Sequence, residues 1–214
     1  MSVSLVWATP EADALIAKIA RVSNPANEDN PDAGRLVRYL IRNQHWSPFE
    51  MVSLCMEIRT TRDIARQILR HRSFCFQEFS QRYADVSALG EPVFREARMQ
   101  DKTNRQSSLP CSNDELSGWW KDTQRDIYEL ASVRYELALM NGIAKEQARA
   151  LLPEGLTPTR MYMKGDVRSW LHYCQLRKGN GTQKEHADIA AAAWEVLRGV
   201  VPVVVQAVEE ESEG

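Results

Sequence analysis

The chain has 214 residues, enough for one domain with a substantial core, and its formal net charge is only -2 at pH 7. Such a balance gives no general attraction to nucleic acid or membranes, so an anion site would have to be a local cluster of arginines. No run of about 18 apolar residues predicts a membrane span. The N-terminus does not resemble a signal peptide, and the four separated cysteines favour free thiols in a reducing cytoplasm over a zinc site.

Two helices and a strand are predicted before residue 61. Apolar residues at helical spacing favour helices over residues 10–22 and 32–43, the second of which would bury Tyr39. A turn follows at residues 45–50, where a proline restricts the residue before it. Residues 52–60 are rich in apolar and β-branched side chains and therefore predict a strand.

The segment 61–70 predicts a helix with two contrasting faces. Its apolar side chains fall on one side, and the opposite side carries polar and charged ones: Arg62, Arg66, Gln67 and Arg70. Such a helix would pack on a sheet and present an arginine-lined outer face. Residues 87–109 are polar and weakly patterned, which predicts a long loop with one strand at most.

A long helix and a second strand are predicted next. Ser112 and Glu115 have the spacing of a capping box that opens a helix ending at Asn141. A short helix then ends at Pro153. In residues 156–164 alternate side chains are apolar, and this period of two predicts a strand with one buried face.

Two more helices are predicted in the C-terminal part. Asp166 is placed to cap a helix whose apolar residues recur at helical spacing. After a turn at residues 179–181, Thr182 and Glu185 have the spacing of a second capping box. The helix that follows is predicted to end near Gly199.

Together these elements predict a single α/β (α+β) domain over residues 1–208. It would hold one mixed or antiparallel sheet and several long helices, although the periodicities do not fix the strand order. Residues 209–214 are predicted to form an acidic, flexible tail.

The densest chemistry lies in residues 70–83. Four groups there can bind an anion or move a proton: Arg70, His71, Arg72 and Arg82. Interleaved aromatic residues indicate partial burial. The segment opens at the C-terminal end of a predicted helix, so arginine side chains rather than helix amides would have to hold an anion. A salt-bridged surface loop is the alternative interpretation.

This segment resembles the signature motif of flavin-dependent thymidylate synthases. Arg70-His71-Arg72, followed by seven residues and Ser80, matches the motif. The similarity continues in chain order through flanking segments at residues 20–23, 45–50, 66–67, 82–83, 148–153 and 166–177. Such an ordered series is not a plausible accident, and it covers residues 20 to 190.

The resemblance implies an activity and an assembly. Members of the family methylate dUMP reductively to dTMP, with 5,10-methylenetetrahydrofolate as the carbon donor and FAD, reduced by NADPH, as the hydride source. They use no cysteine nucleophile and work as homotetramers with active sites shared between subunits. The chain would thus be a cytoplasmic enzyme that acts on small molecules and binds no nucleic acid, membrane or metal.

The resemblance also implies the site residues. FAD would be bound by Ser47, Glu50, Arg70, His71, Arg72, Glu78, Asp166, Arg168 and His172, with the first two reaching it from a neighbouring subunit. The dUMP residues would be Gln67, Arg70, Glu78, Phe79, Ser80, Gln81, Arg82, Arg149 and Arg177. The catalytic residues would be Arg177, Ser80 and Glu78. The sequence departs from the family's common pattern at Met51, Gln77, Phe79, Gln81 and His172.

The reaction explains why arginines suit this site. Uracil C5 is a poor nucleophile, and a fixed guanidinium such as Arg177 would make it electron-rich by stabilising negative charge at N3 and O4. Arg82 and Arg149 would hold the dUMP phosphate. Ser80 can be a nucleotide ligand or a nucleophile. The first role is favoured, because His71 is nine positions away and no acid is placed to orient it.

Other functions remain open at this point. They are another flavin- or uridine-nucleotide-binding enzyme and a nucleic-acid-binding module built on the arginine–aromatic loop. The near-neutral charge weighs against the module. The sequence has no GxGxxG motif and no P-loop, which removes those two phosphate cradles but is neutral for a flavin site built from arginines.

Overall fold

The computed structural model describes residues 1–28, 30–179 and 181–213. Its centre is a four-stranded sheet in which every neighbouring pair is antiparallel and the order is β1-β2-β6-β3. In that order the strands are Ser2–Ala8, Ser53–Thr61, Pro158–Asp166 and Cys75–Glu78. The strands predicted at residues 52–60 and 156–164 are confirmed as β2 and β6, and the predicted sheet proves to be antiparallel.

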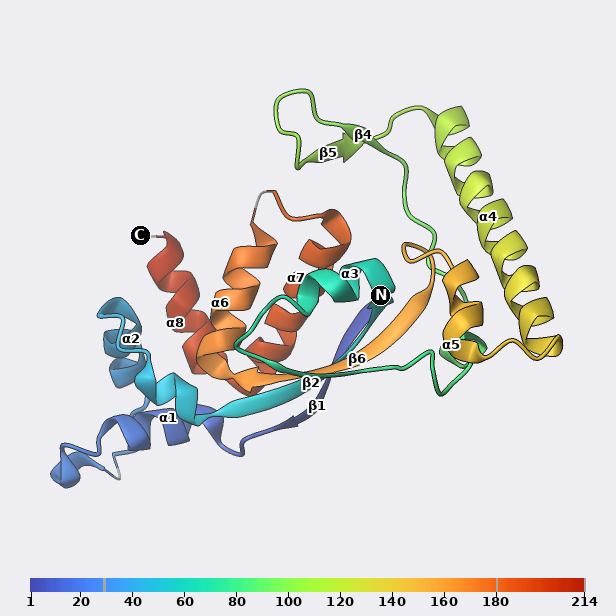
Figure 1. Cartoon of the computed structure of the whole chain (residues 1–214). Coiled ribbons are helices and arrows are strands. Elements are labelled where there is room, and N and C mark those ends of the chain that lie inside the picture. The colour runs from blue at the N-terminus through green and yellow to red at the C-terminus, as the bar shows by residue number, and fades with distance from the viewer. Residues whose placement is uncertain (29, 180, 214) are drawn as a thin grey trace.

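The period of two in β6 decides which face of the sheet is buried. Met161 and Met163 are fully buried, whereas Tyr162 between them is half-buried. Over the buried face lie α3 (Arg62–Ile68), α6 (Val167–Lys178) and α7 (Lys184–Val200) (Figure 1). The domain is therefore α+β, with its core between one sheet face and these helices.

Three further helices lie together at one end of the sheet: α1 (Ala12–Ala20), α2 (Gly34–Arg42) and α8 (Pro202–Glu213) (Figure 1). The Asp13 carboxylate accepts hydrogen bonds from the amides of Val203 and Val204 at 3.0 and 3.2 Å. These amides belong to the first turn of α8, so a side chain of α1 satisfies donors that a helix start leaves unpaired. This contact fixes α8 against the N-terminal helices.

The acidic segment predicted as a tail is helical through residue 213. Glu209 accepts hydrogen bonds from Arg198 at 2.6 Å and from the indole of Trp194 at 2.8 Å, and Glu210 pairs with Arg38 at 2.8 Å. These bonds lower the pKa of the Glu209 carboxyl to about 2. Residue 214 lies outside the described residues, as does residue 180 within the turn predicted at 179–181.

The segment after β3 departs from the compact core. A short hairpin of β4 (Arg98–Gln100) and β5 (Ser108–Pro110) leads into α4 (Asp114–Met140), which stands away from the sheet beside α5 (Lys145–Ala148) (Figure 1). On α4 six large apolar side chains are exposed: Trp119, Ile127, Leu130, Val133, Leu137 and Met140. The long loop predicted at residues 87–109 therefore contains all of β4, and β5 begins just before it ends.

Single-turn 3₁₀ helices complete the chain at Pro25–Asn27, Ser47–Met51, Val86–Leu89 and Arg149–Leu151. The second of these replaces the turn predicted at residues 45–50. In the described ranges, no helix is both long and apolar enough to cross a membrane.

Several helix details differ from the predictions. Asn113, not Ser112, caps α4 through a bond from the Leu116 amide, and α7 has no side-chain cap in place of the predicted box at Thr182. Tyr39, predicted to be buried, is 55% exposed. The predicted cap at Asp166 is confirmed, because its carboxylate accepts the Ser169 amide hydrogen at 2.7 Å.

Substitution of Gly165 in β6 should destabilise the protein, because a Cβ there would lie 2.5 Å from the Phe74 ring. That ring is buried and packs against Trp170 at a centroid distance of 4.9 Å, so its displacement would disturb the core. We expect Gly165→Ala to lower the free energy of unfolding by about 1–3 kcal/mol, measured by denaturant titration. Gly155→Ala, whose Cβ would meet no atom within 4 Å, is the control, and an equal loss in both would contradict the steric explanation.

Candidate active site

The signature segment is a tight connection between α3 and β3. The His71 amide bonds to the Ile68 carbonyl at 3.1 Å as α3 ends, and the Phe74 amide bonds to the His71 carbonyl at 3.3 Å. Phe74 is buried, and it anchors the segment, whereas Arg70 and Arg72 are exposed. The local fold therefore turns these two arginines outward and directs His71 toward α6.

Arg177, in the last turn of α6, meets His71. Its Nε donates a hydrogen bond to His71 Nε2 at 2.9 Å. A ring nitrogen that accepts must be unprotonated, so His71 is the neutral tautomer with its proton on Nδ1. Burial, followed by the charges of Arg177 and His172, lowers the pKa of His71 to about 4, which is consistent with that state.

A buried histidine, His186, lies beside the half-buried His71. The rings of His71 and His186 are 6.3 Å apart, and the ring of Tyr173 is 4.9 Å from His71. His186 Nε2 is 3.2 Å from the Tyr173 hydroxyl, and its Nδ1 is 3.3 Å from Gln67 Oε1. Neither His186 nor Tyr173 could be recognised as a site residue from the sequence, because an isolated histidine or tyrosine in a helical pattern carries no signal of its own.

Four of the nine expected flavin residues line one pocket of about 560 Å³, whereas Ser47, Arg70, His71, Arg72 and Glu78 do not line it. Glu50, Asp166, Arg168 and His172 line it, together with Trp46, Ser73, Ser169, Leu171 and Gln175. Arg168 forms an ion pair with Glu50 of the same chain. Ser47 begins the 3₁₀ turn that carries Glu50. Glu50 was expected to act from a neighbouring subunit, yet it already shares this pocket with its own chain's Arg168.

The remaining signature residues lie beyond the opposite end of β3. Glu78 Oε1 accepts hydrogen bonds from Thr159 Oγ1 at 2.8 Å and Arg62 Nη1 at 3.4 Å. The Phe79 amide bonds to the Arg160 carbonyl at 2.9 Å, which continues the pairing with β6. Glu78 is thus fixed at the edge of the sheet.

Ser80, Arg82 and Arg149 form a separate group beside α5. The Ser80 hydroxyl accepts the Arg82 amide hydrogen at 3.4 Å, and Arg82 pairs with Glu146 at 3.5 Å. Arg149 Nε donates to the Glu146 carbonyl at 3.2 Å. Gln81 is buried, and its Nε2 has no hydrogen-bond partner within the described part of the chain.

One chain therefore does not bring all the predicted arginines together. Arg177 contacts His71 and so lies near the end where β3 begins. Arg82 and Arg149 lie past the end where β3 stops. Since a strand rises about 3.3 Å per residue, the four residues of β3 span roughly 10 Å, on the order of a nucleotide's length.

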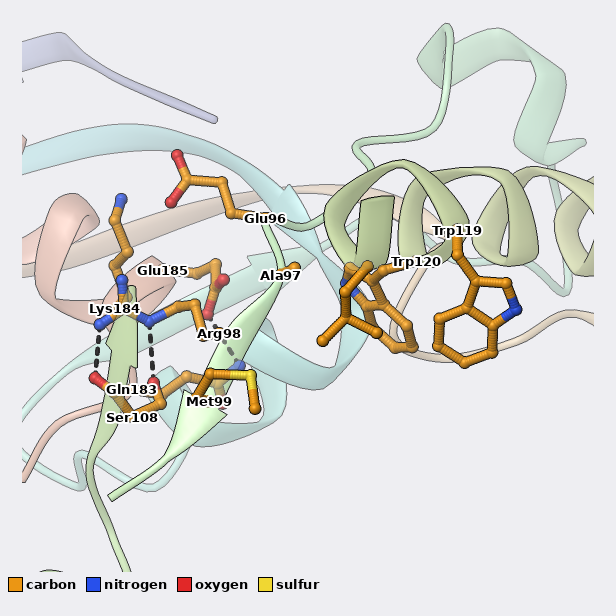
Figure 2. Close-up of a pocket in the computed structure, with 11 residues that line it drawn as sticks. Glu96, Ala97, Arg98, Met99, Ser108, Trp119, Trp120, Gln183, Lys184 and Glu185 are labelled. Carbon is orange, nitrogen blue, oxygen red and sulfur yellow. Dashed lines mark hydrogen bonds between the residues drawn. The ribbon is translucent and has the colours of Figure 1, made fainter. Parts of the chain in front are cut away.

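Another pocket, of about 420 Å³, opens between the β4–β5 hairpin, α4 and the start of α7. Figure 2 shows Trp119 and Trp120 on one side of it, with Gln183 bonded to Glu185 on the other. Gln183 Oε1 also accepts a hydrogen bond from Gln67 Nε2 at 2.8 Å. The start of α7 thus connects this pocket to α3, the helix that carries Gln67.

His71 and His186 together predict a pH dependence of stability. Burial first, and then Arg177, lowers the pKa of both rings from 6.5 to about 4. As pH falls below about 6.5, the unfolded chain takes up protons that the folded chain excludes, so the folded state loses stability progressively. We expect denaturant titrations between about pH 7.5 and 5, above the usual carboxyl range, to show this loss. His186→Asn should make the decrease shallower, and an unchanged slope would contradict the assignment.

Comparisons with known proteins identify the family of this chain. Residues 4–203 match the family model described as thymidylate synthase complementing protein. The chain is 50% identical to the flavin-dependent thymidylate synthase of a Synechocystis strain, over 92% of this chain and 89% of that one. It is 47% identical to a probable flavin-dependent thymidylate synthase of Paramecium bursaria Chlorella virus 1, over 92% and 91% of the two chains.

A solved structure is similar over nearly the whole chain. The UMP/dUMP methylase PolB from Streptomyces cacaoi, bound with 5-Br dUMP, superposes with a TM-score of 0.82 at 26% identity. The match covers 98% of this chain and 94% of the other. With a family model that spans almost its full length and relatives near half identity, this chain belongs to the family of flavin-dependent thymidylate synthases.

Proposed function

We propose that this protein converts dUMP to dTMP by reductive methylation in the cytoplasm. The carbon would come from 5,10-methylenetetrahydrofolate, and FAD, reduced by NADPH, would supply the hydride. Family membership supports the reaction and the flavin. The observation that carries the proposal is the Arg177 guanidinium, held by neutral His71 beside the pocket of the expected flavin residues.

The residues of that pocket fit a flavin dinucleotide. Arg168 and the N-terminal end of α6 offer positive charge for a pyrophosphate. Glu50 and Asp166 provide carboxylate oxygens that can accept hydrogen bonds from ribose hydroxyls, and the indole of Trp46 adds an apolar wall. With Ser47, Arg70, His71, Arg72, Glu78 and His172, these residues would form the FAD site.

Arg177 would activate the pyrimidine. Its Nε is taken by His71, while its two Nη groups have no hydrogen-bond partner among the described residues. A guanidinium presented in this way can place two N–H donors along one edge of uracil. Negative charge at N3 and O4 would be stabilised there, which makes C5 the more reactive carbon. Glu78 and Ser80 would complete the catalytic residues, Ser80 as a ligand of the nucleotide.

The nucleotide phosphate would be held by Arg82 and Arg149 of another subunit. Within one chain these arginines lie past the far end of β3 from Arg177, and the shared sites that the family resemblance implies would place them and Arg177 in different chains. The exposed apolar side chains of α4 support subunit contact. We infer a homotetramer with shared sites, in which Gln67, Arg70, Phe79 and Gln81 also bind dUMP and residues 1–208 form the catalytic domain.

The proposed role of Arg177 can be tested by its removal. Arg177→Ala should lower tritium release from 5-tritiated dUMP by about 100-fold or more, because the charge stabilisation at the pyrimidine is lost. Flavin absorbance of the purified variant should stay at the wild-type level. Arg42→Ala, which removes a mostly exposed arginine of α2, is the control.

Two outcomes would contradict this assignment. One is turnover near that of the wild type, and the other is loss of flavin together with activity. The same assay should also be run with 5-tritiated UMP, because the structurally similar PolB is a UMP/dUMP methylase.

The shared site can be tested by mixing two inactive variants. Co-expression of Arg149→Ala and Arg177→Ala chains should restore about a quarter of wild-type turnover, the fraction of two-chain sites that random assembly leaves intact. Co-expression of Arg177→Ala with the double variant is the control and should restore none. Mixed oligomers that stay inactive would show that Arg149 and Arg177 of each site come from one chain or that the site lacks one of them.

A further inference from the structure

A continuous line of hydrogen bonds joins a side chain of α6, through Gln67 of α3, to side chains at the start of α7. It joins five side chains in this order: Tyr173, His186, Gln67, Gln183 and Glu185. Only Gln67 belongs to the residues already proposed to bind the nucleotide. The other four have no role in the reaction as described so far.

The partners at each end fix the direction of every bond. Glu185 is a carboxylate and can only accept, so Gln183 donates to it through Nε2 at 2.9 Å. Gln183 then presents Oε1 to Gln67, whose Nε2 donates at 2.8 Å. Gln67 is left to accept through Oε1, which requires the proton of His186 to be on Nδ1.

The far end of the line is consistent with that tautomer. With its proton on Nδ1, His186 can only accept at Nε2, and the Tyr173 hydroxyl donates to it at 3.2 Å. Burial raises the pKa of Tyr173, so the hydroxyl keeps its proton, and the lowered pKa of His186 keeps that ring neutral. His186 is 1% exposed and Tyr173 is fully buried, so water does not compete for these bonds.

We propose that Tyr173 and His186 are positioning residues of the nucleotide site, which act by fixing the orientation of the Gln67 amide. Gln67 uses one N–H for Gln183, and its second N–H remains available to an acceptor oxygen of dUMP. If the amide rotated by half a turn, it would present its carbonyl oxygen in place of that donor. This inference rests on the proposed function, since it takes dUMP as the ligand of Gln67.

A purely structural role for the pair makes a different prediction. Two buried aromatic side chains would then contribute packing and stability, and dUMP affinity would follow stability alone. A positioning role changes the KM for dUMP much more than kcat or flavin content. The two roles therefore differ in a measurable quantity.

The first test is Tyr173→Phe in the FAD-loaded protein. It removes the hydroxyl that selects the His186 tautomer and keeps the ring. We expect the KM for dUMP, and its dissociation constant by calorimetry, to rise about 3- to 10-fold, the effect of one lost hydrogen bond. Tyr135→Phe is the matched control, because Tyr135 is also buried but its hydroxyl has no partner in the described residues.

The second test separates the two nitrogens of His186. In His186→Asn the side-chain amide can replace the Nδ1–H that Gln67 receives, whereas His186→Gln places its amide near the Nε2 position, toward Tyr173. We expect the asparagine variant to bind dUMP more tightly than the glutamine variant, at equal flavin content. This comparison decides the matter even if Tyr173→Phe does not fold.

Two results would overturn the positioning role while the proposed function stands. One is a wild-type dUMP affinity in Tyr173→Phe, and the other is equal weakening in His186→Asn and His186→Gln. A wild-type protein that neither binds dUMP nor releases tritium from it would instead overturn the proposed function, and this inference with it.

Discussion

The contact between Arg177 and His71 is the interaction on which the candidate site depends. It joins the last turn of α6 to the signature segment, two parts of the chain more than a hundred residues apart. The contact needs a neutral imidazole, and the buried surroundings of Phe74, Tyr173 and His186 keep the ring in that state. The close approach of Phe74 to Gly165 in turn fixes where the signature segment enters the sheet at the start of β3. Packing thus determines the protonation state, and the protonation state determines where the guanidinium points.

Sheet topology separates two groups of candidate arginines within one chain. β3 is an edge strand, antiparallel to β6, and it carries the signature segment from the Arg177 side of the domain to the α5 side. Arg72 and Arg82, which stand on opposite sides of β3, therefore face different neighbours. A motif that is compact in sequence is thus extended in space, and this separation is consistent with the proposed sharing of sites.

The sequence predicted those features that depend on local physics. The cap at Asp166 and the alternation through Met161 and Met163 need only neighbouring residues, and both are confirmed. β1 was missed because it is an edge strand with mostly exposed side chains, and β3 because it is only four residues long, too short for an alternating pattern to stand out. Thr182 and Glu185 matched a capping box. Glu185 instead accepts a hydrogen bond from Gln183, whose side chain is held in place by its bond to Gln67. The positions of His186 and Tyr173 depend on how α6 and α7 pack, which no local pattern contains.

The candidate arginines also differ in the kind of side chain that each one contacts, a carboxylate or a neutral ring. Arg168 and Arg82 are each paired with a carboxylate of the same chain, Glu50 and Glu146. A bound anion must share or replace those partners, which reduces the net gain from binding. Arg177 instead contacts an uncharged ring, so its full charge is available to the ligand in partly buried surroundings where electrostatic interactions are stronger than in water. A group that must stabilise charge developing in a reaction benefits from such a neutral partner, whereas groups that only hold a phosphate can exchange one anion for another.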